Sequence, residues 1–485
     1  MIKSEEITTV EGPQVLVEVT ASDAEQLAGL LGLDGFRVLA RGEVAGELEV
    51  LVETTETLVG CPACGAVAKP KDRRPVWVRD LPAADRDVVL CWWKRVWECP
   101  HPACGQKTWT ETHDAIAPRA CLTERARQWA FTQVGCHDAA VSATARALGV
   151  AWWTVMTQVL VRGTPLIDDP ARLGAQPSSP DDNAPHDGPD DDGPDDDSPD
   201  DENLVTAVGV DETAFLRATG THPTLFATGI TDLTPGRPAR LLDVAHGRSG
   251  RVLGDWLATQ DPAWRAGIAT ASLDPFRGYA TALATWLPAA TRVLDPFHIV
   301  KLGLGAVDDV RRRVQAEQTG HRGRAGDPLY GIRRVLRRRH DRLSEHAYDR
   351  LKAGLSAGDP NGEVALAWVI AQDLMDLYQA SDLAQARDRT DQLITGLVGC
   401  PILELARLGR TLRAWRAELL AHFTHPTVSN GPTENLNLKI KHTKRIARGY
   451  RNFRHYRLRL LLNHGRNGED HRTSQIRARR PSLAA

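Results

Sequence analysis

Three carboxylates in the sequence follow short apolar runs, and a fourth lies near the start of an expected helix. Asp211 comes directly after AVGV, Asp274 ends ASLD, and Asp295 ends TRVLD, so each is expected at the end of a strand. Glu434 lies in SNGPTENLNLKIK, where residues 430–433 suit a turn and the start of a helix. Carboxylates at apolar strand ends are costly unless they are paired or bind cations. Oxygen ligands that converge at one sheet edge suit Mg²⁺, and two such ions about 3.5–4 Å apart catalyse phosphoryl displacement.

A strongly basic segment begins five residues after Glu434. Residues 439–459 contain nine Lys or Arg and no acid, and Tyr450, Phe453 and Tyr456 are interleaved with them. We expect a basic helix that holds a phosphate backbone beside the metal site, with an affinity that falls as salt rises. The alternative is a solvated surface helix. The candidate DNA contacts are Lys439, Lys441, Lys444, Arg445, Arg448, Arg451 and Arg454.

Seven of the eight cysteines fall between Cys61 and Cys136. CPACG and, 34 residues later, CPHPACG each bring two thiols close together, with a glycine after the second that permits a tight turn. Four thiolates in this arrangement form a closed tetrahedral zinc site of structural type. The predicted Zn²⁺ ligands are Cys61, Cys64, Cys99 and Cys104, with His101 or Cys91 as possible substitutes. The alternative is four reduced cysteines without metal.

The first 165 residues contain three expected modules. Residues 1–55 should form a small α+β segment, with a helix over 22–33 and a strand over 46–55, and residues 56–115 should form the zinc-finger domain. Residues 120–165 are mainly helical, and ARALGVAWWTVM has the glycine break of a helix-turn-helix. Its second helix, 152–162, would present Thr154, Thr157, Gln158 and Arg162 to DNA. The alternative is a plain helical bundle with two packed tryptophans.

An acidic segment, 166–203, separates these modules from the rest. Residues 168–202 carry 14 acids and one Arg, a local charge of −13 in a chain of net charge −2, which leaves +11 elsewhere. We expect a disordered linker, because its composition cannot bury enough apolar surface to offset the entropy of ordering. It serves either as a flexible tether or as a competitor of DNA for basic surfaces. The basic remainder points to a polyanionic partner.

From residue 204 the pattern is that of a mixed α/β domain. Three successive strands, then helix, strand, helix and strand, precede the helical residues 300–428. This order resembles an RNase H-like core, expected over 204–465, with an all-helical insertion at 302–428. Residues 466–485 form a basic C-terminal tail.

Length and composition exclude other classes. The chain has 485 residues, 42% of them hydrophobic and 25% charged, which suits two to four soluble domains. No run of 18 apolar residues exists, and the N-terminus has no apolar core of a signal peptide. The expected location is therefore the cytoplasm.

These motifs occur in the order of a known family. CPACG with CPHPACG, residues 120–162, VGVDETAF, SLDPFRGYA, LDPFHIVKL and SNGPTENLNLKIKHTKRIARGYRNFRHY together resemble transposases of the ISL-three family of bacterial insertion sequences. The most specific string is N-G-x-x-E-x-x-N-x-x-I-K followed by G-Y-R-N-F. The acidic segment departs from the resemblance.

The resemblance implies a DDE transposase with an RNase H-like catalytic domain. Asp211, Asp274 and Glu434 would be the three acids, with Asp295 and His298 in supporting roles. Asp295 remains a rival for the second acid, because it also ends a strand. Two Mg²⁺ ions, or Mn²⁺, would support cleavage at the ends of the element and direct transfer of the 3′-OH to target DNA. The expected partners are terminal-repeat and target DNA and a second copy of the chain, in a dimer or larger assembly at the nucleoid.

Three other readings remain open. A non-catalytic DNA-binding regulator or an inactivated relic would have no use for three placed acids. A host nuclease or resolvase would ignore terminal repeats. A zinc-ribbon adaptor would leave residues 204–485 without a purpose.

Overall fold

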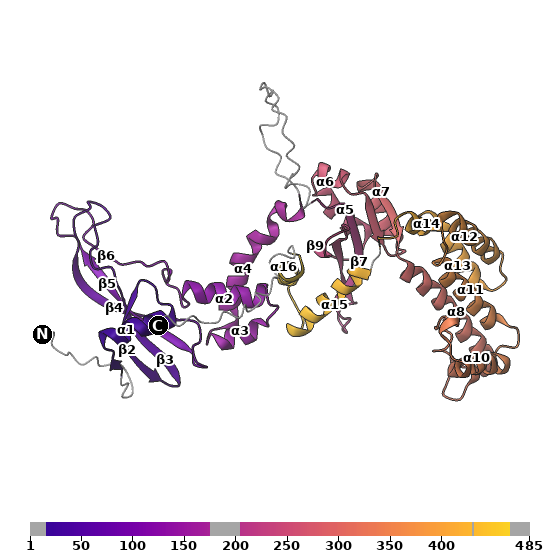
Figure 1. The fold of residues 1–485 in the computed structure, drawn as a ribbon, viewed down its shortest axis with the longest axis horizontal. Coiled ribbons are helices and arrows are strands. Elements are labelled where there is room, and N and C mark those ends of the chain that lie inside the picture. The colour runs from indigo at the N-terminus through magenta and orange to yellow at the C-terminus, as the bar shows by residue number, and fades with distance from the viewer. Residues whose placement is uncertain (1–15, 175–203, 429–430, 466–485) are drawn as a thin grey trace, which may run out of the picture. The chain divides into compact units, whose positions relative to one another are not determined.

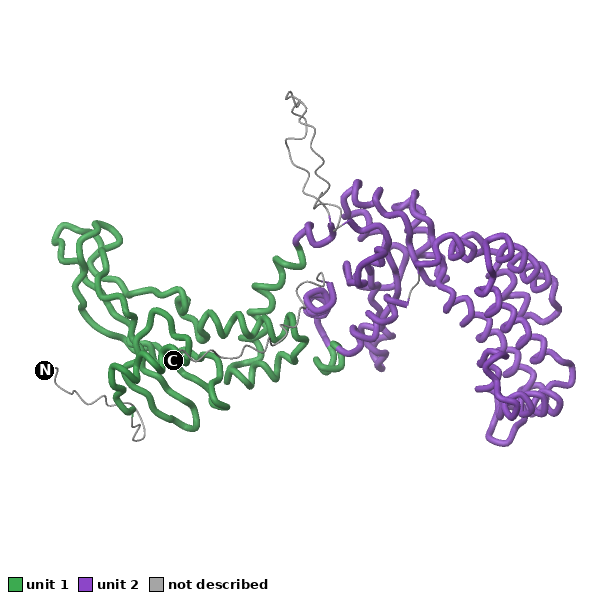
Figure 2. Tube along the Cα trace, in the orientation of Figure 1, with its two compact units in different colours: residues 1–168, 443–449 green, residues 169–442, 450–485 purple. Residues whose placement is uncertain are grey.

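The computed structural model describes residues 16–174, 204–428 and 431–465 (Figure 1). The chain divides into two compact units (Figure 2). Unit 1 comprises residues 1–168 and 443–449, and unit 2 comprises residues 169–442 and 450–485.

Unit 1 contains, in its described residues, a six-stranded sheet with the order β1-β2-β3-β5-β4, in which β6 also pairs with β5. The β2–β3 hairpin turns at Ala45 and Gly46, both with positive φ. The expected helix over 22–33 is α1, which Thr20 caps at its start and Gly32, at φ 59°, ends. The elements are β1 (Val17–Glu18), α1 (Ala21–Leu31), β2 (Phe36–Val44), β3 (Glu47–Thr54), β4 (Lys69–Arg79), β5 (Val88–Glu98) and β6 (Thr108–Thr110).

The expected domain boundary at 55/56 does not separate two folding units. β3 pairs in parallel with β5, so residues on both sides of position 55 build one sheet. Val50 and Val52 from β3 share a core with Leu90 and Trp92 from β5. The boundary prediction was wrong because no local sequence feature shows that β3 pairs with a strand beyond the first cysteine motif.

Three helices follow the sheet. They are α2 (Glu124–Gly135), α3 (Val141–Ala147) and α4 (Trp152–Asp168). The turn between α3 and α4 contains Gly149 at φ 59°, a conformation that residues with a Cβ rarely adopt. Val155, Met156 and Val159 are buried along α4. The predicted glycine break between two helices is therefore present, although α4 runs six residues beyond its expected end at 162.

Unit 2 is built on a sheet that has five strands within residues 204–428, in the order β11-β10-β7-β8-β9. β7, β8 and β9 are antiparallel neighbours, whereas β10 is parallel to both β7 and β11. The predicted succession of three strands, helix, strand, helix and strand agrees with this topology. The elements are β7 (Ala207–Leu216), β8 (Leu225–Asp232), β9 (Arg240–His246), α5 (Gly250–Ala258), α6 (Pro262–Ala266), β10 (Thr270–Leu273), α7 (Arg277–Trp286) and β11 (Thr291–Leu294).

Helices make up the chain between β11 and α15, where the structure gives no strand for residues 295–428. The expected insertion is thus helical, but its predicted start at 302 falls inside α8. The helices are α8 (Pro296–Thr319), α9 (Pro328–Gly331), α10 (Glu345–Gly358), α11 (Glu363–Leu377), α12 (Leu383–Val398), α13 (Leu403–Ala414) and α14 (Arg416–Thr424), with a 3₁₀ turn η3 (His340–Arg342).

The basic run forms two helices, α15 (Gly431–Ile446) and α16 (Phe453–His464), so the expectation of one basic helix was wrong. Arg448 and Gly449 lie between the two helices. Both have positive φ, a backbone conformation that ends the helical path. The last four residues of α15 and the break belong to unit 1, where the Thr443 hydroxyl donates a 2.7 Å hydrogen bond to Asp138.

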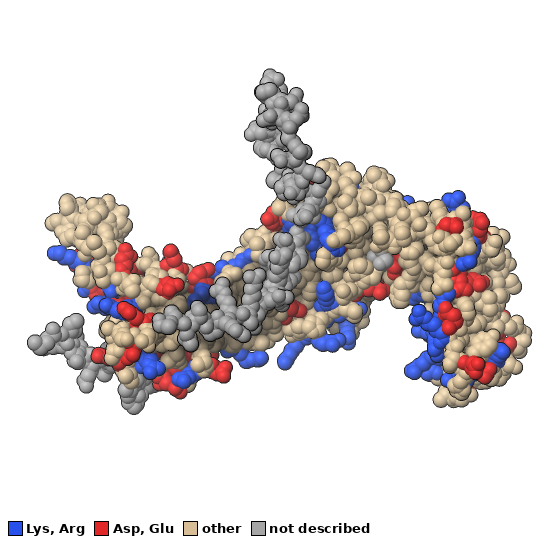
Figure 3. Space-filling view, in the orientation of Figure 1, with Lys and Arg blue, Asp and Glu red and all other residues tan. Residues whose placement is uncertain are grey.

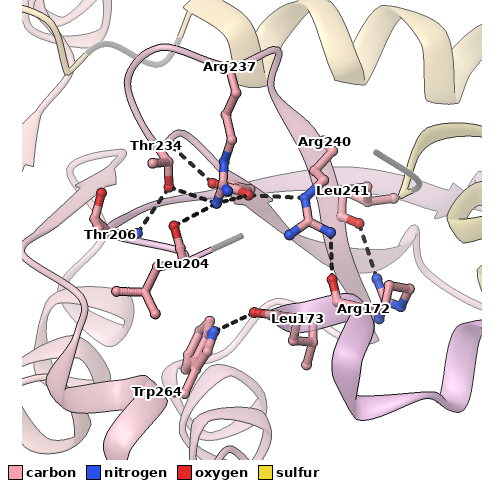
Figure 4. A network of polar contacts seen from close by, with 10 residues as sticks. Arg172, Leu173, Leu204, Thr206, Thr234, Arg237, Arg240, Leu241 and Trp264 are labelled. Atoms are coloured by element: carbon pink, nitrogen blue, oxygen red, sulfur yellow. Dashed lines mark hydrogen bonds and ion pairs between the residues drawn. The ribbon is translucent and has the colours of Figure 1, made fainter. Parts of the chain in front are cut away.

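One polar network fixes the described residues on both sides of the acidic segment (Figure 4). Arg240 donates to the buried carboxylate of Asp232 (3.0 Å) and to the carbonyl of Arg172, in the 3₁₀ turn η1 (Pro170–Leu173). Arg237 donates to the same carboxylate (2.8 Å) and to the carbonyl of Leu204 (2.9 Å). Within the predicted linker, residues 166–168 end α4 and residues 170–173 form η1, so this part is structured, and residues 175–203 lie outside the described residues. The expected tail, 466–485, lies outside them too.

Candidate active site and nucleic-acid interface

Three aspartates lie side by side on neighbouring strands of the sheet in unit 2. Asp274 and Asp295 follow the ends of β10 and β11 as expected, but Asp211 lies inside β7, so the expectation that it ends a strand was wrong. The register pairs Val210 of β7 with Leu273 of β10, and Leu273 with Leu294 of β11. One residue further along each parallel strand are Asp211, Asp274 and Asp295. Neighbouring strands are about 4.8 Å apart, so Asp274 lies one strand from Asp211 and Asp295 lies two strands, about 10 Å, away.

Asp211 and Asp274 are close enough to disturb each other's charge. Burial raises the pKa of Asp211, and the neighbouring Asp274 raises it further, to about 6. The backbone N–H of Glu212, which donates to Asp211 at 2.6 Å, opposes the shift only in part. Two neighbouring carboxylates of this kind are a fitting donor set for a divalent cation, which removes their repulsion.

His298 connects Asp274 with Asp295. Its Nε2 lies 3.0 Å from Asp274 Oδ2, and its Nδ1 lies 3.2 Å from Asp295 Oδ2. Burial lowers the pKa of His298, but the hydrogen bonds to Asp274 and Asp295 outweigh it and raise the pKa to about 9. The side chain of Asp295 is 6% exposed and that of Asp274 is 24% exposed. Asp295 therefore lies behind His298, whereas Asp274 reaches the surface.

Helix α15 packs its first turn onto β7 beside Asp211. A Cβ on Gly209 would lie 2.7 Å from Thr433 Oγ1, so the glycine allows this close approach. One turn further on, Asn437 hydrogen-bonds to the Asp211 carboxylate. Glu434, in the first turn, lies between these two contacts and is half-buried. The helix thus brings Glu434 to the Asp211 end of the sheet.

The carboxylates are not drawn into a closed cage. In the part of the chain that the structure describes, only a group of cysteines brings three or more ligand atoms within 4.8 Å of one another. At least one of the distances among the carboxylates of Asp211, Asp274 and Glu434 therefore exceeds this limit.

Asp211 and Asp274 open onto a cleft of about 1020 Å³ whose lining comes from the sheet, α8 and α13. Four cations on its wall were not among the predicted site residues: Arg248, Lys301, Arg337 and Arg407. Of these, Lys301 could have been identified from the sequence, because it lies in the motif LDPFHIVKL. The other three lie in segments that share no sequence pattern, so only the folded structure brings them together. Asn437 was likewise missed, although it lies within ENLN.

The four predicted zinc ligands do converge. The Sγ atoms of Cys61, Cys64, Cys99 and Cys104 lie within 4.8 Å of one another. Cys61 and Cys104 are 3.8 Å apart, and Cys64 and Cys99 are 3.5 Å apart. Four sulfurs around zinc at about 2.3 Å are about 3.8 Å apart, so the set fits the ion.

The two possible substitutes do not join this group. Cys91 lies in the middle of β5, and its burial raises the pKa of its thiol to about 12. His101 contributes only its backbone N–H, which donates to Cys99 Sγ at 3.4 Å.

One of the four residues expected to reach DNA from the helix-turn-helix, Arg162, contacts another helix instead. Arg162 pairs with Glu124 on α2 and donates to Gln128 (3.1 Å), so it holds two helices together. Trp152 and Trp153, 44% and 57% exposed, begin α4 and stack on each other at 5.7 Å. The packed-tryptophan alternative is therefore wrong. Thr154, Thr157 and Gln158 are half-buried.

The seven predicted DNA-contacting cations are all at least partly accessible. Lys444 is half-buried and the other six are exposed. The remaining two members of the basic run have structural roles: Arg457 pairs with Asp243 at 2.6 Å, and Arg459 is 1% exposed. Phe453 and Tyr456 also pack inward, against Phe215.

One side of α15 carries Glu434, Asn437, Lys441 and Arg445, because spacings of three and four residues return to the same side of a helix. Lys439 lies about 140° away from Glu434 around this helix. Figure 3 shows Lys and Arg side chains gathered over α15 and over the helical part of unit 2 near α8. Of these cations, Lys441 lies both on the Glu434 side and in unit 2, so it is the one best placed to accompany the carboxylates.

No helix in the described ranges is both long and apolar enough to cross a membrane.

Comparisons with known proteins agree with these features. The profile of the ISL3 transposase family, described as "Transposase", matches residues 208–460, just over half of the chain. A second profile, "Helix-turn-helix domain of transposase family ISL3", matches residues 111–160.

Two curated relatives are each described as "Transposase for insertion sequence element IS1557", from Mycobacterium tuberculosis strains CDC 1551 / Oshkosh and ATCC 25618 / H37Rv. Each is 25% identical over 264 residues, 50% of this chain and 56% of the relative. The chain thus spans about half the length of these relatives.

Among solved structures, the "Drosophila P element transposase strand transfer complex" is similar over 56% of this chain and 78% of that one, at 10% identity. Its TM-score of 0.31 is too low to support an argument. The two matching profiles are sufficient by themselves: the protein belongs to transposase family ISL3.

Proposed function

We propose that the chain is a DDE transposase that cuts DNA at the ends of an insertion element and joins those ends to target DNA. In the first step, water attacks the phosphodiester at the element end, and the leaving 3′ oxygen becomes a 3′-OH. In the second, this 3′-OH attacks a target phosphodiester and displaces its 3′ oxygen. The first step hydrolyses one phosphate ester bond and leaves the oxygen of the water on the 5′-phosphate, and the second exchanges one phosphate ester bond for another. Because water and the 3′-OH are the nucleophiles, no Ser or Tyr nucleophile is required.

The observation that carries this proposal is the side-by-side placement of Asp211 and Asp274, with α15 joined to Asp211 through Asn437. A fold that needed these acids only as surface groups would not bury Asp211 next to a like charge. Asp274 is the better candidate for the second acid, because Asp295 lies two strands from Asp211 and behind His298.

Asp211, Asp274 and Glu434 would hold Mg²⁺ or Mn²⁺, and the cysteine group would hold Zn²⁺ as a fold staple. When bound, divalent cations supply a deprotonated nucleophile and neutralise charge on the phosphate. The chain's own groups orient the reaction: His298 fixes Asp274, Asn437 fixes Asp211, and Lys441 holds the phosphate backbone. The repulsion between the carboxylates of Asp211 and Asp274 is the observation that supports bound cations, because cations would neutralise it.

An RNase H-like core is the fold that we infer for unit 2. Three antiparallel strands, with two further strands parallel to the first on its other side, support this inference. The inferred catalytic domain covers 204–465 and is interrupted by the helices between α8 and α14.

Further partners follow from the proposed reaction. The helix-turn-helix and the zinc module would bind the terminal repeats, and the basic α15 would follow the backbone near the cut. Two element ends must be held together, which favours a dimer or a larger assembly. Because the substrate is chromosomal DNA, we expect the protein to work at the bacterial nucleoid.

The test uses DNA from both flanks of the gene in a Mg²⁺-dependent cleavage and strand-transfer assay. D211N, D274N and E434Q should each abolish both steps and leave end binding intact. The control is D255N, an exposed acid on α5 that pairs with Arg251. Wild-type cleavage by any of the three variants would remove that residue from the site. Equal cleavage of DNA without terminal repeats would favour a host nuclease.

A further inference from the structure

The tripeptide Asp-Pro-Phe occurs twice, at the carboxyl ends of the adjacent strands β10 and β11. Its two phenylalanines are Phe276 and Phe297, which are 41% and 55% exposed. Both line the cleft that contains Asp211 and Asp274. Large apolar side chains that are exposed together beside a polar site mark a binding surface.

Neighbouring groups hold the two rings in place. Phe276 packs edge-on against Tyr279, with ring centroids 4.9 Å apart. A Cβ on Gly278 would lie 2.6 Å from the Phe276 ring, so the glycine makes room for it. Phe297 packs edge-on against His298 at 5.4 Å, next to the residue that fixes Asp274. The rings are thus positioned relative to the carboxylates.

The cleft combines these rings with positive charge. Arg248, Lys301, Arg337 and Arg407 share its wall, and its volume of about 1020 Å³ is at the upper end of ordinary ligand sites, roughly 300–1,000 Å³. Aromatic faces with neighbouring cations are the combination that binds single-stranded nucleic acid, because rings stack on bases while cations hold phosphates.

We propose that Phe276 and Phe297 stack an unpaired base of the DNA strand beside the phosphate to be cut. The inference rests on the proposed function and adds a substrate feature to it. Bases inside a duplex are covered on both faces by their neighbours, so a base that reaches these rings has left the stack. The element end is therefore opened, or already unpaired, when it enters the cleft.

The test measures binding by the full-length protein without added Mg²⁺, so that it does not depend on cleavage. The probes are a blunt duplex of the element end and the same duplex with three unpaired nucleotides at the cleavage side. One unpaired base is 2-aminopurine, whose fluorescence reports stacking. The variants are F276A, F297A and the double variant, with F276Y/F297Y as the conservative pair. L403A, which removes a 73% exposed leucine that does not line the cleft, is the matched control.

Wild type should prefer the overhang probe and change the 2-aminopurine signal. Each alanine variant should lose about tenfold of that preference, a typical effect of losing one aromatic–base stack. The tyrosine pair and L403A should retain the preference, and blunt-duplex binding should not change. A melting temperature close to that of wild type shows that the variants are folded.

The inference is wrong if the alanine variants still prefer the overhang probe over the blunt duplex. It is also wrong if their affinities for the two probes decrease by the same factor. It also falls if the variants change only self-association, because the rings would then cover a second copy. Its failure is separate from that of the proposed function. Cleavage that needs Asp211 but not the two phenylalanines leaves the reaction standing. Cleavage that does not need Asp211 overturns the reaction, whatever the overhang assay gives.

Discussion

Gly209 offers a direct way to displace Glu434 without touching an acid. In G209A, the new Cβ would lie 2.7 Å from Thr433 Oγ1 and 2.6 Å from Leu233 Cδ1. Ordinary van der Waals contact begins at 3.4 Å. The new Cβ would therefore lie about 0.7 Å too close to Thr433 Oγ1 in the first turn of α15. The leucine methyl group can rotate away, but the Thr433 side chain is 2% exposed and therefore has little room to turn aside.

A shift of this size matters because Glu434 follows Thr433 directly. A misplacement of about 1 Å can cost on the order of 10²-fold in rate. We therefore expect G209A to slow strand cleavage by about 10- to 100-fold. The strain should also lower the stability of unit 2 by about 1–3 kcal/mol, as overpacking does.

The matched control is G229A on the neighbouring strand β8. Gly229 pairs with Asp211 in the register, yet a Cβ there would meet no atom closer than 3.8 Å. The assay is Mg²⁺-dependent nicking of end DNA, with end binding measured by gel shift. G209A should lose nicking and keep binding, while G229A should keep both. Wild-type nicking by G209A, or equal losses in the two variants, would refute the packing argument.

Three further predictions concern other parts of the chain. Cys61→Ser should remove the bound zinc, measured by metal analysis of the purified protein, whereas Cys91→Ser, outside the group, should retain it. Glu53, buried with Arg95 at 3.1 Å, has its pKa raised by burial but lowered more by Arg37, Arg95 and Arg73, to below its usual 4.5. Its contribution is therefore present above pH 4.5 and lost as the pH falls through the lower folded pKa, so the unfolding free energy of wild type should fall more steeply with acid than that of E53Q. In a third variant, about ten Gly and Ser residues, each spanning up to roughly 3.3 Å, replace residues 175–203. The melting temperature and the cleavage rate should not change, because Arg240 and Arg237 already hold both flanks of this segment on Asp232. A cleavage rate that falls as the segment is shortened would support the tether instead.

Strand-end acids and cysteine spacing were predictable because local rules govern them. Asp274 and Asp295 directly follow the ends of β10 and β11 as expected, whereas Asp211 lies inside β7, which continues to Leu216. CPACG needs no distant information to indicate a metal knuckle. The same rules predicted the glycine break at Gly149 and the order of elements in unit 2. Each of these features depends on a few neighbouring residues.

Features that depend on contacts between residues far apart in the sequence could not be predicted. Nothing local shows that β3 pairs with β5, so the first two modules were divided where the sheet is continuous. The basic run looked uniform, but Arg457 meets Asp243, more than 200 residues earlier in the chain, and Arg459 is buried. The proposal of Asp274 rather than Asp295 as the second acid also depends on the strand order, which the sequence does not show.

The most direct test of the central claim asks whether Asp211, Asp274 and Glu434 surround one metal position. Fe²⁺ replaces Mg²⁺ in the purified protein, and ascorbate with peroxide generates hydroxyl radicals that cut the backbone near the ion. We predict cuts close to residues 211, 274 and 434, competed by Mg²⁺ and absent in D211N. Cuts near only one of these residues, or an unchanged pattern in D211N, would contradict a shared site.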